Sequence, residues 1–192
     1  MHSLRPLAAL ARLPTSAPMV IALFNNMSNI ELLGYSKDNK ALYLDLDSSH
    51  ALTHFAKYPN LKSLVQEHIS AITFDTTIIR CEIDTGKEVG LCDLVATNES
   101  DEIIYAKRPL RHTYSRFVKN RNSEPTTWFV LDIRKQRSGD YFLYTAYVGR
   151  LTPTFPGGNF LPEQSHEFWS NHALVWGSQE IVPGTETTVC PW

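Results

Sequence analysis

Residues 105–121 read YAKRPLRHTYSRFVKNR and hold six Lys or Arg side chains and one His, with no carboxylate among them. His112 stands beside Arg111 and four residues before Arg116. Histidine is a common general base near neutral pH, and nearby cations stabilise the negative charge that develops on a phosphate under attack. Such a set can cleave RNA without a metal, because a base removes the 2′-hydroxyl proton and the cations hold the phosphorane.

The rest of this chemistry would come from residues farther along the chain. Tyr144 and Thr145 in YFLYTAYVG and Thr127 in PTTWFVLDIRK are strand-borne candidates for the same site. His172 in FWSNHALVWG could protonate the departing 5′-oxygen, or could equally be a core histidine at the start of a strand. Four more cations are candidates for binding phosphate: Lys107, Arg108, Lys119 and Arg121.

Positive charge is concentrated in one segment of a nearly neutral chain. Residues 107–137 hold nine of the 18 Lys and Arg residues, opposed only by Glu124 and Asp132, so this segment carries +7. Because the whole chain carries −2, the remainder carries −9. Segregated charge of this kind favours one surface that faces a polyanion. The competing interpretation is a solvated helix face that happens to be basic.

Several other classes of site lack support. No run of 18 apolar residues suggests a membrane-spanning helix, and neither a GxxxxGK[ST] nor a GxGxxG motif is present. His50 and His54 in HALTH have a chelating spacing, but Ala51 stands where a zinc protease needs Glu, so two ordinary helix histidines are favoured. We therefore expect no metal and no cofactor, and a cytoplasmic protein that does not bind membranes.

Three cysteines do not make a disulfide framework. The segment TTIIRCEIDTGKEVGLCDLVAT is typical of two strands around a turn, and this pairing would place Cys81 opposite Cys92. A cross-strand bridge is conceivable there, although two reduced and packed thiols are favoured.

The pattern of apolar residues predicts an α+β protein in three parts. Residues 1–26 are expected to form a leader or a poorly ordered N-terminus. Residues 27–75 predict two short strands and two helices, as an N-terminal α/β region. Residues 76–192 predict an antiparallel sheet, with strands over 76–83, 88–96, 102–106, 127–134, 140–149 and 172–176. KQRSG is the expected turn of the clearest hairpin.

The basic stretch itself would pack on this sheet as a helix or a loop. Pro109 excludes an earlier helix start, and a helix from Leu110 would place His112, Arg116 and Lys119 on one side. The loop LTPTFPGGNFLPEQSHEFW is long enough to form a lid or a binding wall. Its Phe155, Phe160 and Trp169 would cover the sheet or stack on a base.

The order of RHTYSR, PTTWFVLDIRK and YTAYVG resembles the barnase–EndoU–colicin–RelE group of small ribonucleases, which includes many bacterial toxin domains. The resemblance covers about residues 76–177 and implies a metal-independent endoribonuclease acting on tRNA or another structured RNA. By position it makes His112 the base, Arg111 and Arg116 phosphate ligands, and Thr127, Tyr144 and Thr145 strand-borne contributors. The chain continues AYVGR where some members have AYP, so it assigns nothing to Tyr147 and Arg150.

Two functions of different classes follow. The first is a metal-independent ribonuclease, as a toxin or effector domain with a neutralising protein partner. The second is a non-catalytic module that binds nucleic acid or an acidic partner through the basic surface of residues 107–137. Replacing His112 separates them, because the enzyme would lose activity without losing binding.

Overall fold

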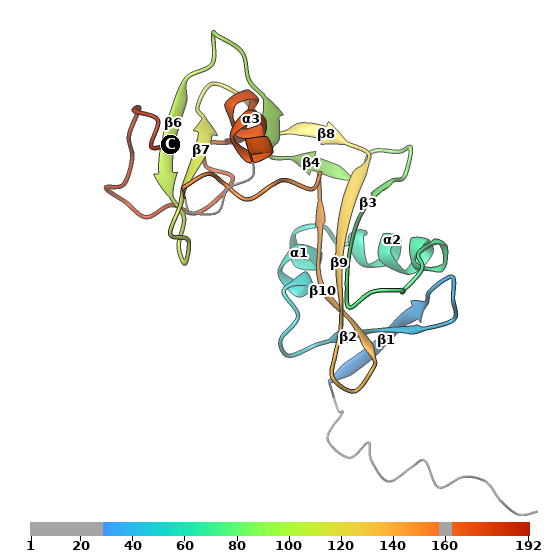
Figure 1. The fold of residues 1–192 in the computed structure, drawn as a ribbon. Helices are drawn as coiled ribbons and strands as arrows, with labels where there is room; N and C mark the ends of the chain where they lie inside the picture. The colour runs from blue at the N-terminus through green and yellow to red at the C-terminus, as the bar shows by residue number, and fades with distance from the viewer. Residues whose placement is uncertain (1–28, 158–162) are drawn as a thin grey trace, which may run out of the picture.

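The computed structural model describes residues 29–157 and 163–192, which form two lobes built on two separate sheets (Figure 1). Residues 1–26, expected to form a leader, lie outside the described residues. So does Phe160, which was predicted to cover the sheet or stack on a base. The α+β class expected from the sequence is confirmed, with helices and mostly antiparallel strands.

The lower lobe in Figure 1 contains a five-stranded sheet in the order β1-β2-β10-β9-β3. Its strands are β1 (Ile30–Tyr35), β2 (Ala41–Asp45), β3 (Ile78–Asp84), β9 (Trp128–Lys135) and β10 (Tyr141–Val148). Neighbours are antiparallel except β2 and β10, which run parallel and pair only at Tyr141–Leu42 and Phe142–Tyr43. The predicted hairpin is confirmed, since β9 and β10 are joined by a turn in which Gln136 N donates to Asp140 O at 2.8 Å.

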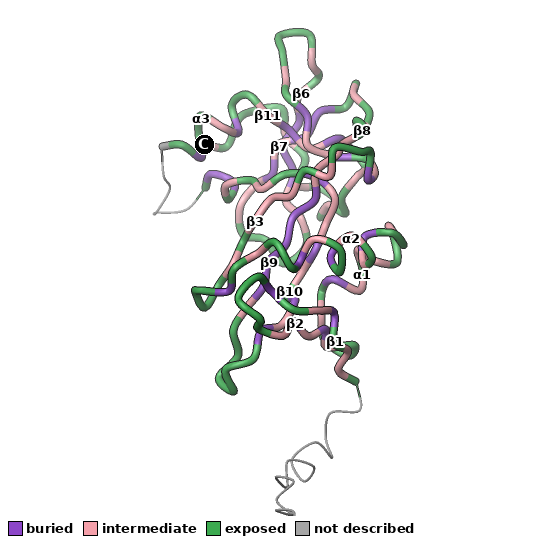
Figure 2. The backbone as a smooth tube through the Cα atoms, turned by 90° about the vertical axis from the view of Figure 1, so that its right-hand side faces the viewer, coloured by how far each residue is buried: buried purple, intermediate pink, exposed green. Residues whose placement is uncertain are grey.

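One face of this sheet forms the main core. Along β9, Phe129, Leu131 and Ile133 are fully buried and lie opposite every second residue of β3. Their partners on β10 are Val148, Ala146 and Leu143, because a bulge shifts the register. The helices α1 (Ala51–Lys57) and α2 (Leu61–His68), followed by a 3-10 turn at Ile69–Ala71, contribute to the same core. Figure 2 shows the consequence, with the middle of β9 buried and the β9–β10 turn exposed.

The upper lobe contains a four-stranded sheet in the order β5-β11-β7-β6, and a helix, α3 (Glu163–Asn171). Its strands are β5 (Leu94–Ala96), β6 (Ile103–Lys107), β7 (Tyr114–Val118) and β11 (His172–Val175). Small apolar clusters cover both faces, one around Val118 and one around Phe117. A short pair, β4 (Gly90–Cys92) with β8 (Glu124–Thr126), lies where the chain passes between the lobes (Figure 1).

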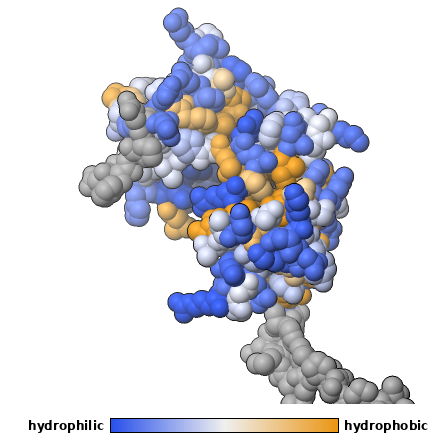
Figure 3. Space-filling model, turned by 45° about the vertical axis from the view of Figure 1, so that its right-hand side comes forward, coloured by the Kyte–Doolittle hydropathy of each residue, from blue (hydrophilic) through white to orange (hydrophobic). Residues whose placement is uncertain are grey.

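The structure corrects the boundary expected at residue 75. Residues 30–45 are not a separate N-terminal region, because β2 pairs with β10 and completes the sheet formed by β3, β9 and β10. The residues expected to form one C-terminal sheet are instead divided between the two lobes. On the face drawn in Figure 3, hydrophobic side chains are visible where the lobes meet, with hydrophilic side chains around them.

Two local predictions were also wrong. The helix considered from Leu110 is absent, and residues 114–118 form strand β7, which pairs with β6 from Lys107–Tyr114 to Ile103–Val118. Cys81 does not face Cys92, because β3 pairs with β9 and β4 pairs with β8. All three cysteines are free in this structure. Within the described residues, no helix is long and apolar enough to cross a membrane.

Candidate nucleic-acid interface

The basic stretch forms a β-hairpin, which we call the basic hairpin (residues 107–121). Arg111 N donates to Arg108 O at 3.1 Å and closes the tight turn between β6 and β7. Arg111 and His112 lie in this connection, and both side chains are exposed. Lys107 lies at the end of β6 with its ammonium 5.2 Å from the centroid of the Tyr114 ring. The hairpin therefore presents cations and an imidazole to solvent from a hydrogen-bonded ribbon.

Three other arginines of the predicted site are held by contacts within the chain. Arg108 Nε donates to Ser115 Oγ at 3.0 Å, and its guanidinium lies 5.3 Å from the centroid of the Phe155 ring. Burial, with a smaller effect from Arg111, lowers the pKa of Arg108. Its charge is therefore held against the body of the upper lobe, at the first position of the turn.

Arg116 and Arg121 also have structural contacts. Arg116 Nη1 donates to Thr97 Oγ1 and to the carbonyl oxygen of His172, both at 2.9 Å, and so ties β7 to β5 and β11. Arg121 forms ion pairs with Glu124 at 2.8 Å and with Asp101 at 3.6 Å, and the bond to Glu124 is the main cause of its raised pKa. Arg116 is therefore committed to holding strands together, and Arg121 is neutralised.

The two carboxylates of segment 107–137 are both bound by arginines of the same segment. Glu124 pairs with Arg121, and Asp132 pairs with Arg134 at 3.0 Å and with Arg80 of β3 at 2.8 Å. The other seven cations of the segment form no salt bridge with any described residue. They are Lys107, Arg108, Arg111, Arg116, Lys119, Lys135 and Arg137.

The seven cations do not form one surface, and this corrects the single basic face expected over residues 107–137. Five belong to the basic hairpin of the upper lobe, whereas Lys135 and Arg137 lie at the β9–β10 turn. That turn is at the far end of the lower lobe in Figures 1 and 2. The sequence brings the two groups within 16 residues of each other, but the long strand β9 carries the chain away from the upper sheet.

Tyr144 and Thr145 lie on the sheet of the lower lobe, at a β-bulge of β10 between Leu143 and Thr145. The Arg134 guanidinium lies over the Tyr144 ring, 3.3 Å from its centroid, and Tyr144 is 46% exposed. Thr145 faces Asp132 in register, and its Oγ1 is buried without a hydrogen-bond partner among the described residues. The structure thus brings Tyr144 and Thr145 together with Arg134 and Asp132, on a different sheet from Arg111 and His112.

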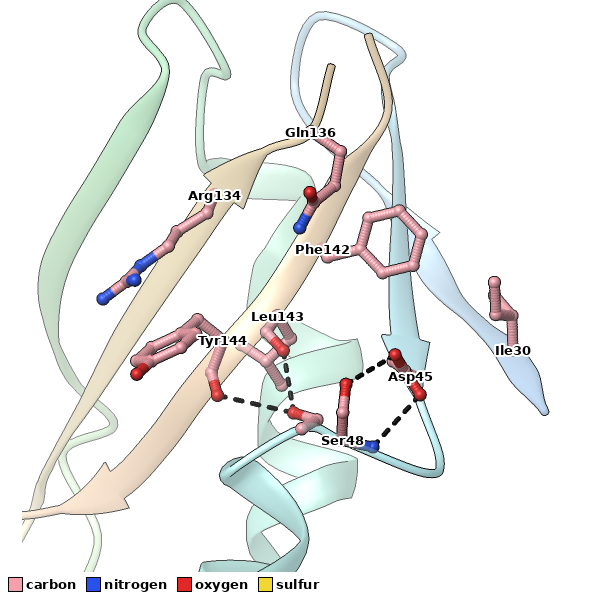
Figure 4. Close-up of a pocket in the computed structure, with 9 residues that line it drawn as sticks. Ile30, Asp45, Ser48, Arg134, Gln136, Phe142, Leu143 and Tyr144 are labelled. Carbon is pink, nitrogen blue, oxygen red and sulfur yellow. Dashed lines mark hydrogen bonds between the residues drawn. The ribbon is translucent and has the colours of Figure 1, made fainter. Parts of the chain in front are cut away.

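A cavity of about 390 Å³ opens beside Tyr144. It forms where β2 and β10 separate after their two paired positions, and Figure 4 shows Arg134, Gln136 and Phe142 on one side and Asp45 and Ser48 on the other. The hydroxyl of Ser48 donates to Asp45 Oδ2 at 2.6 Å, and this bond is the main cause of the lowered pKa of Asp45.

The cavity thus combines a guanidinium, a carboxylate and an apolar wall, and could hold a small polar molecule. The sequence alone does not indicate this cavity, because β2 and β10 are about a hundred residues apart in the chain. His112 and Arg111 are not among its lining residues.

Two further residues were predicted to be catalytic, His172 and Thr127, and both make contacts within the fold. His172 Nδ1 lies 2.9 Å from the carbonyl oxygen of Phe168, and the two rings stack with centroids 4.1 Å apart. These contacts favour the core interpretation of His172. Thr127 lies between β8 and β9, and its carbonyl oxygen accepts a hydrogen bond from Thr85 N at 3.0 Å. The nearby Thr127 side chain is the main cause of the lowered pKa of the Asp84 carboxyl group.

The histidine pair of HALTH lies on α1, with ring centroids 5.1 Å apart. Over residues 29–157 and 163–192, no group of three or more His, Cys, Asp or Glu side chains is arranged to hold a metal ion. In the loop expected to act as a lid, Phe155 stacks on buried Trp169 with centroids 3.6 Å apart. This pair packs against the turn of the basic hairpin through Arg108.

Comparisons with protein-family models, with curated proteins and with solved structures give no match to this chain.

Proposed function

We propose that this protein binds structured RNA through the basic hairpin. The observation that carries the proposal is the distribution of its charges: Lys107, Arg111 and Lys119 have no carboxylate partner among the described residues. Two nearby acids, Asp101 and Glu124, are both bound to Arg121 instead. Free cations of this kind gain affinity for a phosphate backbone by releasing its counterions.

The form of the hairpin supports a nucleic acid as the partner. Only its turn end projects from the upper sheet, because β7 also pairs with β11 and Lys107 O accepts from Val182 N. A projecting hairpin turn is narrow enough to enter a groove of a duplex. A-form RNA has a wide, shallow minor groove bordered by phosphates and 2′-hydroxyl groups, which a ribbon tip can reach. The ribbon is also anchored, because Arg108 bonds to Ser115 across it and Thr113 packs near Gly157. An anchored ribbon loses little conformational entropy on binding.

The test is a fluorescence anisotropy titration of a labelled RNA stem-loop at several salt concentrations. For the wild type we expect log K to fall steeply with log salt, and for Arg111→Ala we expect the slope to be shallower by about one phosphate contact. Lys87→Ala is the matched control, since Lys87 is an exposed cation of the β3–β4 connection. Equal slopes for all three proteins, or no binding at low salt, would overturn the proposal.

A metal-independent ribonuclease is the second candidate, and one observation favours it. The imidazole of His112 is exposed beside Arg111, and no hydrogen bond engages its ring within the part of the chain that the structure describes. It is therefore free to act as a base on a 2′-hydroxyl, as the resemblance implies. Incubation of wild type and His112→Ala with total RNA in EDTA tests this candidate. Discrete products made only by the wild type would support it, and intact RNA with both proteins would exclude it.

A further inference from the structure

The tip of the basic hairpin carries an apolar side chain that no described residue covers. Leu110 is 100% exposed, the most exposed of the large hydrophobic residues described, and its backbone has φ +60°. Leucine is rarely found in this left-handed region, because its Cβ crowds the following carbonyl group. Such an outlier invites a functional explanation.

The turn explains how Leu110 is held outward. Arg108 O accepts from Arg111 N, so Pro109 and Leu110 occupy the two central positions of a β-turn. Pro at the first of these and a positive φ at the second are the features of a type II turn, whose second central residue is usually Gly or Asn. A leucine there keeps the turn strained and directs its side chain away from the ribbon.

The surroundings of Leu110 indicate what this side chain meets. Lys107, Arg108, Arg111 and His112 flank it, and the chain has no carboxylate between Glu102 and Glu124. Arg111 and His112 are exposed beside the tip, whereas the Arg108 guanidinium is turned back toward Ser115 and Phe155. An exposed apolar tip next to cations is complementary to a polyanion with an apolar interior, which is the description of a base-paired nucleic acid. Proteins that kink duplexes use Leu, Pro and similar side chains as wedges between base steps, beside cations on the phosphates.

We propose that Leu110, supported by Pro109, inserts between two stacked base pairs of the RNA that the basic hairpin binds. The inference rests on the proposed function, because the cations must first bring the tip to the duplex. Lys107 and Arg111 hold the phosphates on either side, and the leucine side chain separates the two pairs. An anionic bilayer is the competing partner. It is disfavoured because one leucine and one proline bury too little apolar surface for stable anchoring.

The test uses an RNA duplex with 2-aminopurine at its centre, whose fluorescence rises when the base is unstacked. We expect a rise of several-fold on binding the wild type. Leu110→Asn suits the turn but removes the wedge, and we expect it to abolish the rise while weakening binding by no more than about tenfold, because the cations remain. Leu110→Met keeps an apolar tip and should retain the rise. Val189→Asn is the matched control, at an exposed residue 74% accessible outside the hairpin.

Three results would overturn the inference. A wild type that binds the duplex without any rise in fluorescence contradicts the wedge but leaves the proposed function standing. The same rise with Leu110→Asn as with the wild type also contradicts the wedge. Binding of wild type, but not Leu110→Asn, to vesicles of phosphatidylserine, with no binding to RNA, would replace the duplex by a membrane and refute the proposed function as well.

Discussion

The guanidinium of Arg134 lies 3.3 Å from the centroid of the Tyr144 ring, and the carboxylate of Asp132 holds it there through a 3.0 Å bond. Asp132 also accepts from Arg80 Nε at 2.8 Å, so one buried carboxylate organises two arginines on the outer face of the lower sheet. Tyr144 is therefore engaged with Arg134 rather than with His112.

Replacing Tyr144 should consequently leave RNA binding unchanged. We expect Tyr144→Phe to keep the stacking with Arg134, and to bind an RNA stem-loop within about twofold of the wild type, because Tyr144 is on a different sheet from the basic hairpin. Any cleavage of RNA by the wild type should also persist in this variant. A loss of cleavage would show that the phenol takes part in catalysis, as the resemblance to small ribonucleases implies.

The Asp132 carboxylate should contribute measurably to stability. In Asp132→Asn the amide oxygen can accept from one arginine, but the amide NH₂ faces the other, so the free energy of unfolding should fall by about 1–2 kcal/mol in urea titrations. Arg80→Gln is the control, and because the Arg80 side chain is 57% exposed it should change stability by less than about 1 kcal/mol. Equal stability of Asp132→Asn and wild type would contradict this role.

His54 should make the protein less stable in mild acid. Burial, together with the charges of His50 and Lys57, lowers its pKa from 6.5 to about 4, and its ring packs 5.9 Å from that of Tyr147. Because the unfolded chain binds a proton more readily, stability conferred by the neutral imidazole is complete above pH 6.5 and is lost as the pH falls toward 4. Allowing for partial exposure, we expect about 1 kcal/mol less stability at pH 5 than at pH 7.

Urea titrations of His54→Phe at the two pH values check this expectation. Phe keeps an aromatic ring beside Tyr147 but cannot take up a proton, so its stability should change little between pH 7 and pH 5. His50→Ala should retain most of the pH dependence, since the desolvation of His54 is the larger cause. A wild type whose stability is flat over this range would refute the assignment.

The thiols should differ in reactivity as their burial differs. Cys190 is exposed, whereas burial raises the pKa of the Cys81 and Cys92 thiols, which reduces their thiolate fraction. We expect Ellman's reagent to label one thiol quickly in the folded protein and all three after denaturation. Cys190→Ser should abolish the fast phase. Persistence of a fast phase in that variant would show that a buried thiol is accessible.

The strands that the sequence predicted are those with one apolar face and clear turns. The alternation of Phe129, Leu131 and Ile133 with Trp128, Val130 and Asp132, followed by KQRSG, predicted the β9–β10 hairpin. Strand β7 was missed although buried Ser115 and Phe117 alternate with half-buried Tyr114 and Arg116, because Ser115 is polar and hides the apolar alternation. The helical spacing of His112, Arg116 and Lys119 then favoured a helix where the chain forms a strand.

The site was harder to predict than the strands. Whether Arg111 and Tyr144 meet depends on which sheet each strand joins, and the division into two sheets follows from long-range pairings such as β2 with β10 and β11 with β7. Local patterns do not encode such pairings. The exposure and positive φ of Leu110 could not be predicted from the sequence, because both depend on the β6–β7 turn. The predicted helix from Leu110 would have replaced that turn.

Photo-crosslinking tests the central claim most directly. A structured RNA substituted with 4-thiouridine is irradiated in complex with the full chain, and the linked peptides are identified by mass spectrometry. If the basic hairpin is the RNA-binding surface, the crosslinks fall within residues 107–121 and are reduced by Arg111→Ala. Crosslinks confined to the β9–β10 turn or to the cavity beside Tyr144, with none in the hairpin, would contradict the account.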